Sequence, residues 1–269
     1  MTEKEDALSD LNEAGVIAGL TWAWDSARRH ALLSYDRPTG HTQGWLGSTA
    51  WTLLVDRLDR VFSCGRFTVA PSGDKDAETG DDILAEGLLP GEHDTMPHLA
   101  PGLVVRHDLN GSDGWRYKEW RWLLQSFGGM DIDSIPWPRM KPTKKLVALQ
   151  PAPHEPVIPG FEQLMAIDVL EEISDTPAID LPIVTLVLAW AINAHTEKSE
   201  LFFGRPRYNK GRTEAWHWRT RLDQDHTDGG YGAKPLPVIP PDSSPQPVRD
   251  VEVRLRSTAK EGNSQKDGR

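Results

Sequence analysis

Residues 46–62 have the sequence LGSTAWTLLVDRLDRVF, and this stretch determines how the first half of the chain is interpreted. Its apolar side chains recur every three or four positions, at Leu46, Ala50, Leu54, Leu58 and Val61. Charged residues fill the opposite side between positions 56 and 60. The spacing predicts an amphipathic helix with one side buried in a core, ended by the helix-terminating Gly65.

The segments around this helix carry weaker patterns. Residues 5–19 have near-helical apolar spacing, which predicts an amphipathic helix. Two β-prone runs, 20–24 and 30–35, flank the short polar connection 25–29, which predicts a β-hairpin. Residues 66–70 are expected to form a short strand.

The middle of the chain is expected to contribute strands. Residues 103–109 form one candidate strand, and the turn-forming residues 110–114 follow it. Alternation across 115–127 predicts a returning strand, although the spacing of Trp120, Leu123, Leu124 and Phe127 also fits a helix. Residues 146–149 are another short strand candidate.

The second half is expected to be mainly helical. Prolines between 151 and 160 predict a semi-rigid linker, and 161–173 is amphipathic. Residues 181–192 are almost wholly apolar, with Asp180 as a candidate N-cap, which predicts a buried helix. Residues 234–269 are Pro-rich and then polar, which predicts a disordered tail.

Together these elements predict an α+β fold with a mixed sheet and packed helices. The expected organisation is an α+β subregion over 1–150, the linker 151–160, a smaller mainly helical subregion over 161–222, and the disordered tail.

Composition excludes several classes of protein. The single cysteine, Cys64, cannot form a disulfide within the chain and is expected to be a small core residue. The charged start predicts a cytoplasmic protein, and no apolar run reaches the roughly 20 residues of a membrane helix, so no membrane partner is expected.

With 30 Lys and Arg against 40 Asp and Glu, the net charge is −10. Residues 1–102 hold 8 basic and 17 acidic side chains, so −9 of this charge lies there.

Several standard sites fail on spacing. The chain has no GxxxxGK(S/T) loop, no GxGxxG, no HExxH and no GxSxG. The acidic cluster at 223–228 has Asp228 where a calcium loop needs Gly, and Lys234 where it needs Glu. No metal site and no cofactor are therefore predicted.

The leading functional hypothesis concerns residues 205–221, where six basic residues accompany one acid, Glu214. The candidate binding residues are Arg205, Arg207, Tyr208, Lys210, Arg212, Trp216, Trp218, Arg219 and Arg221. Basic side chains neutralise phosphates and aromatic rings stack on bases. This pattern predicts a non-enzymatic module that binds nucleic acid or another polyanion. The alternatives are a solvated basic face and a patch that docks on the acidic N-terminal half, and a protein partner also stays open.

A second hypothesis is a metal-dependent phosphodiester hydrolase. Asp108 at a strand end and Glu119 on the returning strand are the candidate Mg²⁺ ligands, with Arg121 where such nucleases commonly carry Lys. Arginine neutralises a phosphate but does not act as a base. Asp36 and His41, at a junction before the helix at 46–62, are further candidates for a pocket, although a turn and a helix start are the favoured explanation. The 11 tryptophans are expected mainly to pack in the core.

Overall fold

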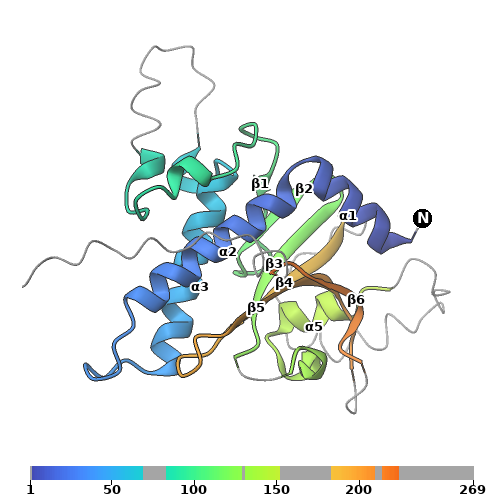
Figure 1. Cartoon of the computed structure of the whole chain (residues 1–269). Helices are drawn as coiled ribbons and strands as arrows, with labels where there is room; N and C mark the ends of the chain where they lie inside the picture. The colour runs from blue at the N-terminus through green and yellow to red at the C-terminus, as the bar shows by residue number, and fades with distance from the viewer. Residues whose placement is uncertain (1, 69–82, 129–130, 152–182, 210–213, 224–269) are drawn as a thin grey trace, which may run out of the picture. The chain divides into compact units, whose positions relative to one another are not determined.

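The structure is a computed structural model that describes residues 2–68, 83–128, 131–151, 183–209 and 214–223 (Figure 1). It has a six-stranded mixed sheet with helices packed against it, which confirms the α+β prediction. The predicted helix at 161–173, the tail at 234–269 and all of the linker except Pro151 lie outside the described residues. Among the described residues, no helix is long and apolar enough to cross a membrane.

Three helices form the N-terminal part: α1 (Glu3–Glu13), α2 (Val16–Leu33) and α3 (Gln43–Val61). Helix α3 confirms the amphipathic helix predicted over 46–62. The helix predicted over 5–19 is divided at Gly15, whose φ of 75° interrupts it between α1 and α2. The close approach of α2 and α3 requires another glycine, since a Cβ at Gly19 would lie 2.8 Å from Val61 Cγ1.

The predicted hairpin over 20–35 is wrong, because residues 20–33 belong to α2. Leu20, Ala23, Trp24, Ala27 and Ala31 are all fully buried. Their spacing is helical, so burial against α3 and the sheet outweighs the β propensity of the individual residues.

The sheet contains β1 (Val105–Arg106), β2 (Gly114–Tyr117), β3 (Trp120–Ser126), β4 (Val184–Ile192), β5 (Ser199–Pro206) and β6 (Trp216–Arg221) in that order. Only β3 and β4 are parallel, and the other neighbouring pairs are antiparallel. Most of residues 115–127 form strand and not helix. A turn at Lys118, whose φ is 51°, divides this segment into β2 and β3. Of the strand predicted over 103–109, only β1 forms.

Three further local predictions are wrong. Residues 184–192 form the strand β4 and not a helix. Residues 146–148, predicted as a strand, belong to the helix α5 (Pro142–Ala148), and Leu149 is its C-cap. Residues 65–67 form the 3-10 helix η1 (Gly65–Phe67) where a strand was predicted from 66. The regular elements in the described part of the expected helical subregion are β4, β5 and β6, which are strands of the same sheet as β1–β3.

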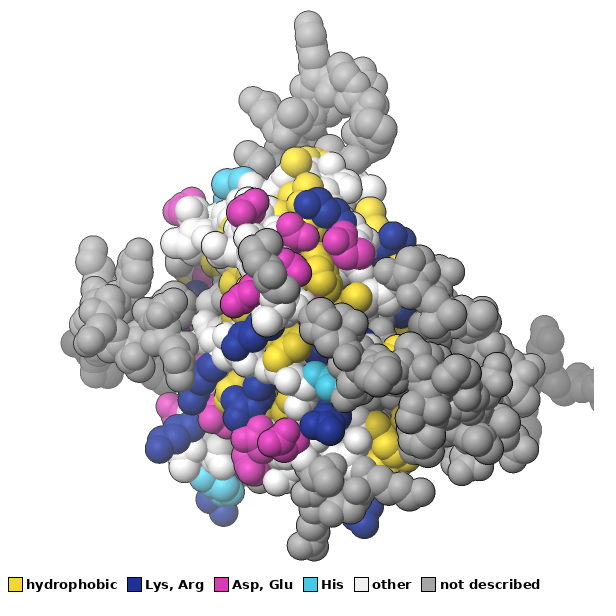
Figure 2. All heavy atoms as spheres, turned by 90° about the vertical axis from the view of Figure 1, so that its right-hand side faces the viewer, with side chains coloured by type: hydrophobic (Ala, Val, Ile, Leu, Met, Phe, Trp, Pro, Cys, Tyr) yellow, Lys and Arg dark blue, Asp and Glu magenta, His cyan; other side chains and the backbone are white. Residues whose placement is uncertain are grey.

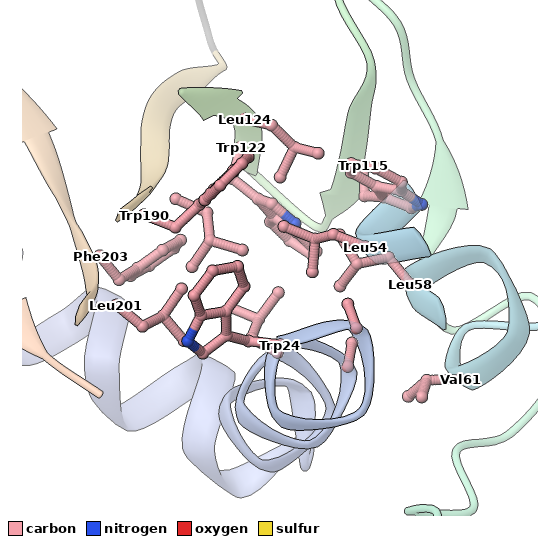
Figure 3. Packing of buried hydrophobic residues seen from close by; sticks show 14 of the residues in the cluster. Trp24, Leu54, Leu58, Val61, Trp115, Trp122, Leu124, Trp190, Leu201 and Phe203 are labelled. Carbon is pink, nitrogen blue, oxygen red and sulfur yellow. The ribbon is translucent and has the colours of Figure 1, made fainter. Parts of the chain in front are cut away.

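Both faces of the sheet are covered. On one face, Trp122, Leu201 and Phe203 pack against Trp24 and Leu54 of the helices (Figure 3). On the other face, apolar side chains of the strands pack against α5 and the 3-10 helices η3 (Ile132–Ser134) and η4 (Trp137–Arg139). Eight of the 11 tryptophans are buried, and Trp45, Trp51 and Trp218 are partly buried, so core packing is confirmed as their main role. Cys64 is buried, as predicted.

Candidate functional site

The basic segment 205–221 runs from the end of β5 through β6, and its described arginines all contact carboxylates. Arg205 is buried beside Glu3 and also donates to the carbonyl of Pro151. Arg219 donates two hydrogen bonds to Asp133, at 2.8 and 2.6 Å, and these bonds lower the pKa of that carboxyl. Arg221 pairs with Asp223 at 2.6 Å, and Arg207 with Glu214 at 3.6 Å. Lys210 and Arg212 lie outside the described residues.

The aromatic residues of the segment are also engaged within the protein. Trp216 is buried, donates to the carbonyl of Ile132 at 2.8 Å and packs edge-to-face on Trp137. Tyr208 packs against the apolar core on the side of the sheet covered by α5, and Trp218 donates to Glu3 Oε1 at 2.8 Å. On the face that Figure 2 shows, basic and acidic side chains are interspersed. Polyanion binding through this segment stays a prediction, and Arg205 shows the alternative contact with the acidic N-terminal half.

The three hydrolase candidates make separate contacts in the structure. Asp108 accepts hydrogen bonds from Arg106 Nε at 2.6 Å and from the backbone of Gly114, where β2 begins. Glu119 is exposed in the turn that follows the other end of β2. Arg121 is buried and donates to Thr185 Oγ1 at 2.9 and 2.6 Å. In the part of the chain that the structure describes, no group of three His, Cys, Asp or Glu residues could hold a metal ion.

Asp36 and His41 close the loop between α2 and α3. The backbone N–H of Asp36 donates to His41 Nδ1 at 2.9 Å, and the imidazole stacks on Trp45 with 3.8 Å between ring centroids. Thr42 then caps α3 by accepting from the backbone of Trp45. These contacts agree with the turn and helix-start explanation.

A groove with a volume of about 570 Å³ lies between the first half of α3 and the carboxyl ends of β3 and β4. Its lining residues are Gln43, Gly44, Gly47, Ser48, Trp51, Thr52, Ser126, Gly128, Trp190 and Ile192. The register of the parallel strands β3 and β4 places Ser126 beside Trp190, so both strands end at the same side of the sheet. Crevices at the carboxyl ends of parallel strands are frequent ligand sites in open α/β sheets.

Hydrogen bonds fix both walls of this groove. Gln43 Nε2 donates to the carbonyl of Ile192 at 2.7 Å, and its Oε1 accepts from the backbone of Ala194 at 2.8 Å. The indole N–H of Trp51 donates to Asp113 Oδ2 at 3.2 Å, which holds the ring in place. Gly47 has nothing within 4 Å of the position of a Cβ, so the helix backbone borders open space there.

The sequence alone does not reveal this groove, because three distant segments form it. The available local signal was the pair Gly44 and Gly47 next to hydroxyl residues on one helix. That signal has no meaning until residues 184–192 are known to be a strand parallel to β3. Comparison with protein-family models, curated proteins and solved structures finds no match.

Proposed function

We propose that the chain is a binding module that holds a saccharide ring in the groove between α3 and the carboxyl ends of β3 and β4. The observation that carries this proposal is the lining: the Trp51 indole lies beside the hydroxyl residues Ser48, Thr52 and Ser126. None of the described lining residues has an ionisable side chain. A neutral ligand with an apolar face and several hydroxyls matches this combination, since aromatic rings bind flat apolar faces and side-chain hydroxyls both donate and accept hydrogen bonds.

The stiffness of the groove supports the proposal. Asp113 orients the indole of Trp51, and Gln43 ties the start of α3 to the end of β4. A site already held in its binding geometry loses less conformational entropy when a ligand binds. The volume also falls within the range of small-molecule sites, about 300–1,000 Å³.

The test is a titration of the full chain with glucose, galactose, N-acetylglucosamine and their β- and α-linked disaccharides, followed by calorimetry and tryptophan fluorescence. We expect at least one of these sugars to bind, and Trp51→Ala to weaken its binding about tenfold or more, which corresponds to about 1.4 kcal/mol. Gly47→Leu should also abolish binding, because the new side chain enters the open space beside the helix.

Trp45→Ala is the matched control, since Trp45 is a partly buried tryptophan of the same helix that does not line the groove. It should retain the affinity of the unaltered chain. Equal affinity of the Trp51→Ala variant and the unaltered chain, or no binding of any sugar in the panel, would contradict the proposal.

A further inference from the structure

Helix α1 crosses the end of the sheet where β3 and β4 begin (Figure 1). Two of its acidic side chains, Glu3 and Asp10, accept hydrogen bonds from indoles of the strands. Glu3 pairs with Arg205 and accepts from Trp218 Nε1 at 2.8 Å. Asp10 accepts from Trp120 Nε1 at 3.0 Å and lies 3.8 Å from Lys118 Nζ. The two carboxylates thus occupy one Arg, one Lys and two indole N–H groups.

These donors lie together because of the strand directions. Trp120 begins β3, Arg205 lies near the end of β5, and Trp218 is its cross-strand partner in β6. All three therefore lie at the same end of the strands. The seven residue steps from Glu3 to Asp10 span about 10 Å along a helix, which is enough to cross from β3 toward β6 at about 4.8 Å per strand.

The hydrophobic attachment of α1 is small. Only Ala7 and Leu11 of its 11 residues are buried. A helix of this length is not stable alone, so its attachment requires contacts with the rest of the fold. Its hold on the sheet therefore depends substantially on Glu3 and Asp10.

We infer that α1 masks a binding site for single-stranded nucleic acid, with Glu3 and Asp10 in the positions that phosphates would take. When α1 detaches, Arg205 and Lys118 neutralise phosphates, and the indoles of Trp120 and Trp218 offer faces for stacking of bases. This inference is independent of the saccharide groove, which lies at the opposite end of β3 and β4. It also gives a functional reason for the burial of Arg205, the first cation of the basic segment.

The test compares full-length variants by fluorescence anisotropy with labelled oligo(dT) and oligo(U) of about 15 nucleotides. Glu3→Gln/Asp10→Asn removes both carboxylates and keeps their shapes. We expect this variant to bind at least about tenfold more tightly than the unaltered chain, with an affinity that falls steeply between about 50 and about 200 mM NaCl. Adding Arg205→Gln should remove the gain.

The matched control is Asp6→Asn/Glu13→Gln, which makes the same change in net charge on α1 without touching Glu3 or Asp10. Hydrogen exchange of residues 3–13 reports whether α1 is released, and the melting temperature shows whether the variants stay folded. Faster exchange of α1 without tighter oligonucleotide binding than the control overturns the inference. Unchanged exchange overturns the premise that these carboxylates hold α1. If the Glu3→Gln/Asp10→Asn variant binds heparin but neither oligonucleotide, the assignment to nucleic acid is overturned.

Discussion

Replacing Lys144 by Met is expected to stabilise the protein and to change how its stability depends on pH. Lys144 belongs to α5, and its side chain is buried beneath the sheet. Its Nζ donates to the carbonyl of Leu124 at 2.6 Å. Burial lowers the pKa of this amine from 10.5 to about 7, since the charged form loses its hydration there.

The direction of the pH dependence follows from the number of protons that Lys144 binds in the folded and unfolded states. Between about pH 7 and 10.5 the unfolded chain binds a proton at Lys144 that the folded chain does not, so stability rises with pH in this window. Each pKa unit corresponds to about 1.4 kcal/mol, so the lowering from 10.5 to about 7 corresponds to about 5 kcal/mol. Methionine removes this penalty and loses one hydrogen bond, worth about 1 kcal/mol. The variant should therefore be about 4 kcal/mol more stable below pH 7 and slightly less stable near pH 10.5.

The assay is urea denaturation of both proteins at several pH values between about 6 and 10. The difference in free energy of unfolding between variant and unaltered chain isolates Lys144, because the other titrating groups are common to both. Lys198→Met, the same change at an exposed position, is the control for the substitution itself. A difference for Lys144→Met that is constant across this range would refute the argument.

Three further predictions concern packing and surface charge. Leu54→Ala should lower the free energy of unfolding by about 2–5 kcal/mol because Leu54 is fully buried, whereas Leu33→Ala, 63% exposed, should cost under about 0.5 kcal/mol. Comparable effects in urea denaturation would show that the apolar side of α3 does not face the core. Gly204→Ala should cost about 1–3 kcal/mol, since its Cβ would lie 2.3 Å from the carbonyl oxygen of Trp218, and an unchanged melting temperature would contradict this close approach. Arg219→Ala should cost under about 1 kcal/mol near neutral pH, because Arg219 and Asp133 are partly exposed. That cost should disappear as acid protonates Asp133, whose pKa the pairing lowers, and a cost that persists in acid would show that the ion pair is not its source.

The sequence by itself determined the features whose physical cause is local. Helix α3 is amphipathic over its whole length, so its periodicity is sufficient to predict it. The turn after β1 follows from Asn110 and Gly111, which adopt φ of 47° and 70°. The α+β class follows from the coexistence of such segments, and the burial of most tryptophans follows from their size and apolar character.

Tertiary structure decided the elements that are buried on more than one side. Strand β4 sends Leu186 and Leu188 into one core cluster and Val187 and Ala189 into the other. A strand covered on both faces needs no polar residue at alternate positions, so its sequence resembles that of a buried helix, and only its pairing with β3 and β5 identifies it. Helix α2 shows the converse case, in which burial against α3 outweighs local β propensity.

The candidate sites depend on contacts between distant parts of the chain. Gln43 meets Ile192 across 149 positions, and Glu3 meets Arg205 across 202. The residue types of the basic segment were visible in the sequence, but two of the carboxylates that pair with them, Glu3 and Asp133, come from other elements. A local pattern records which side chains are available, whereas the parallel pairing of β3 and β4 and the docking of α1 determine which of them meet, because both depend on the packing of the whole chain.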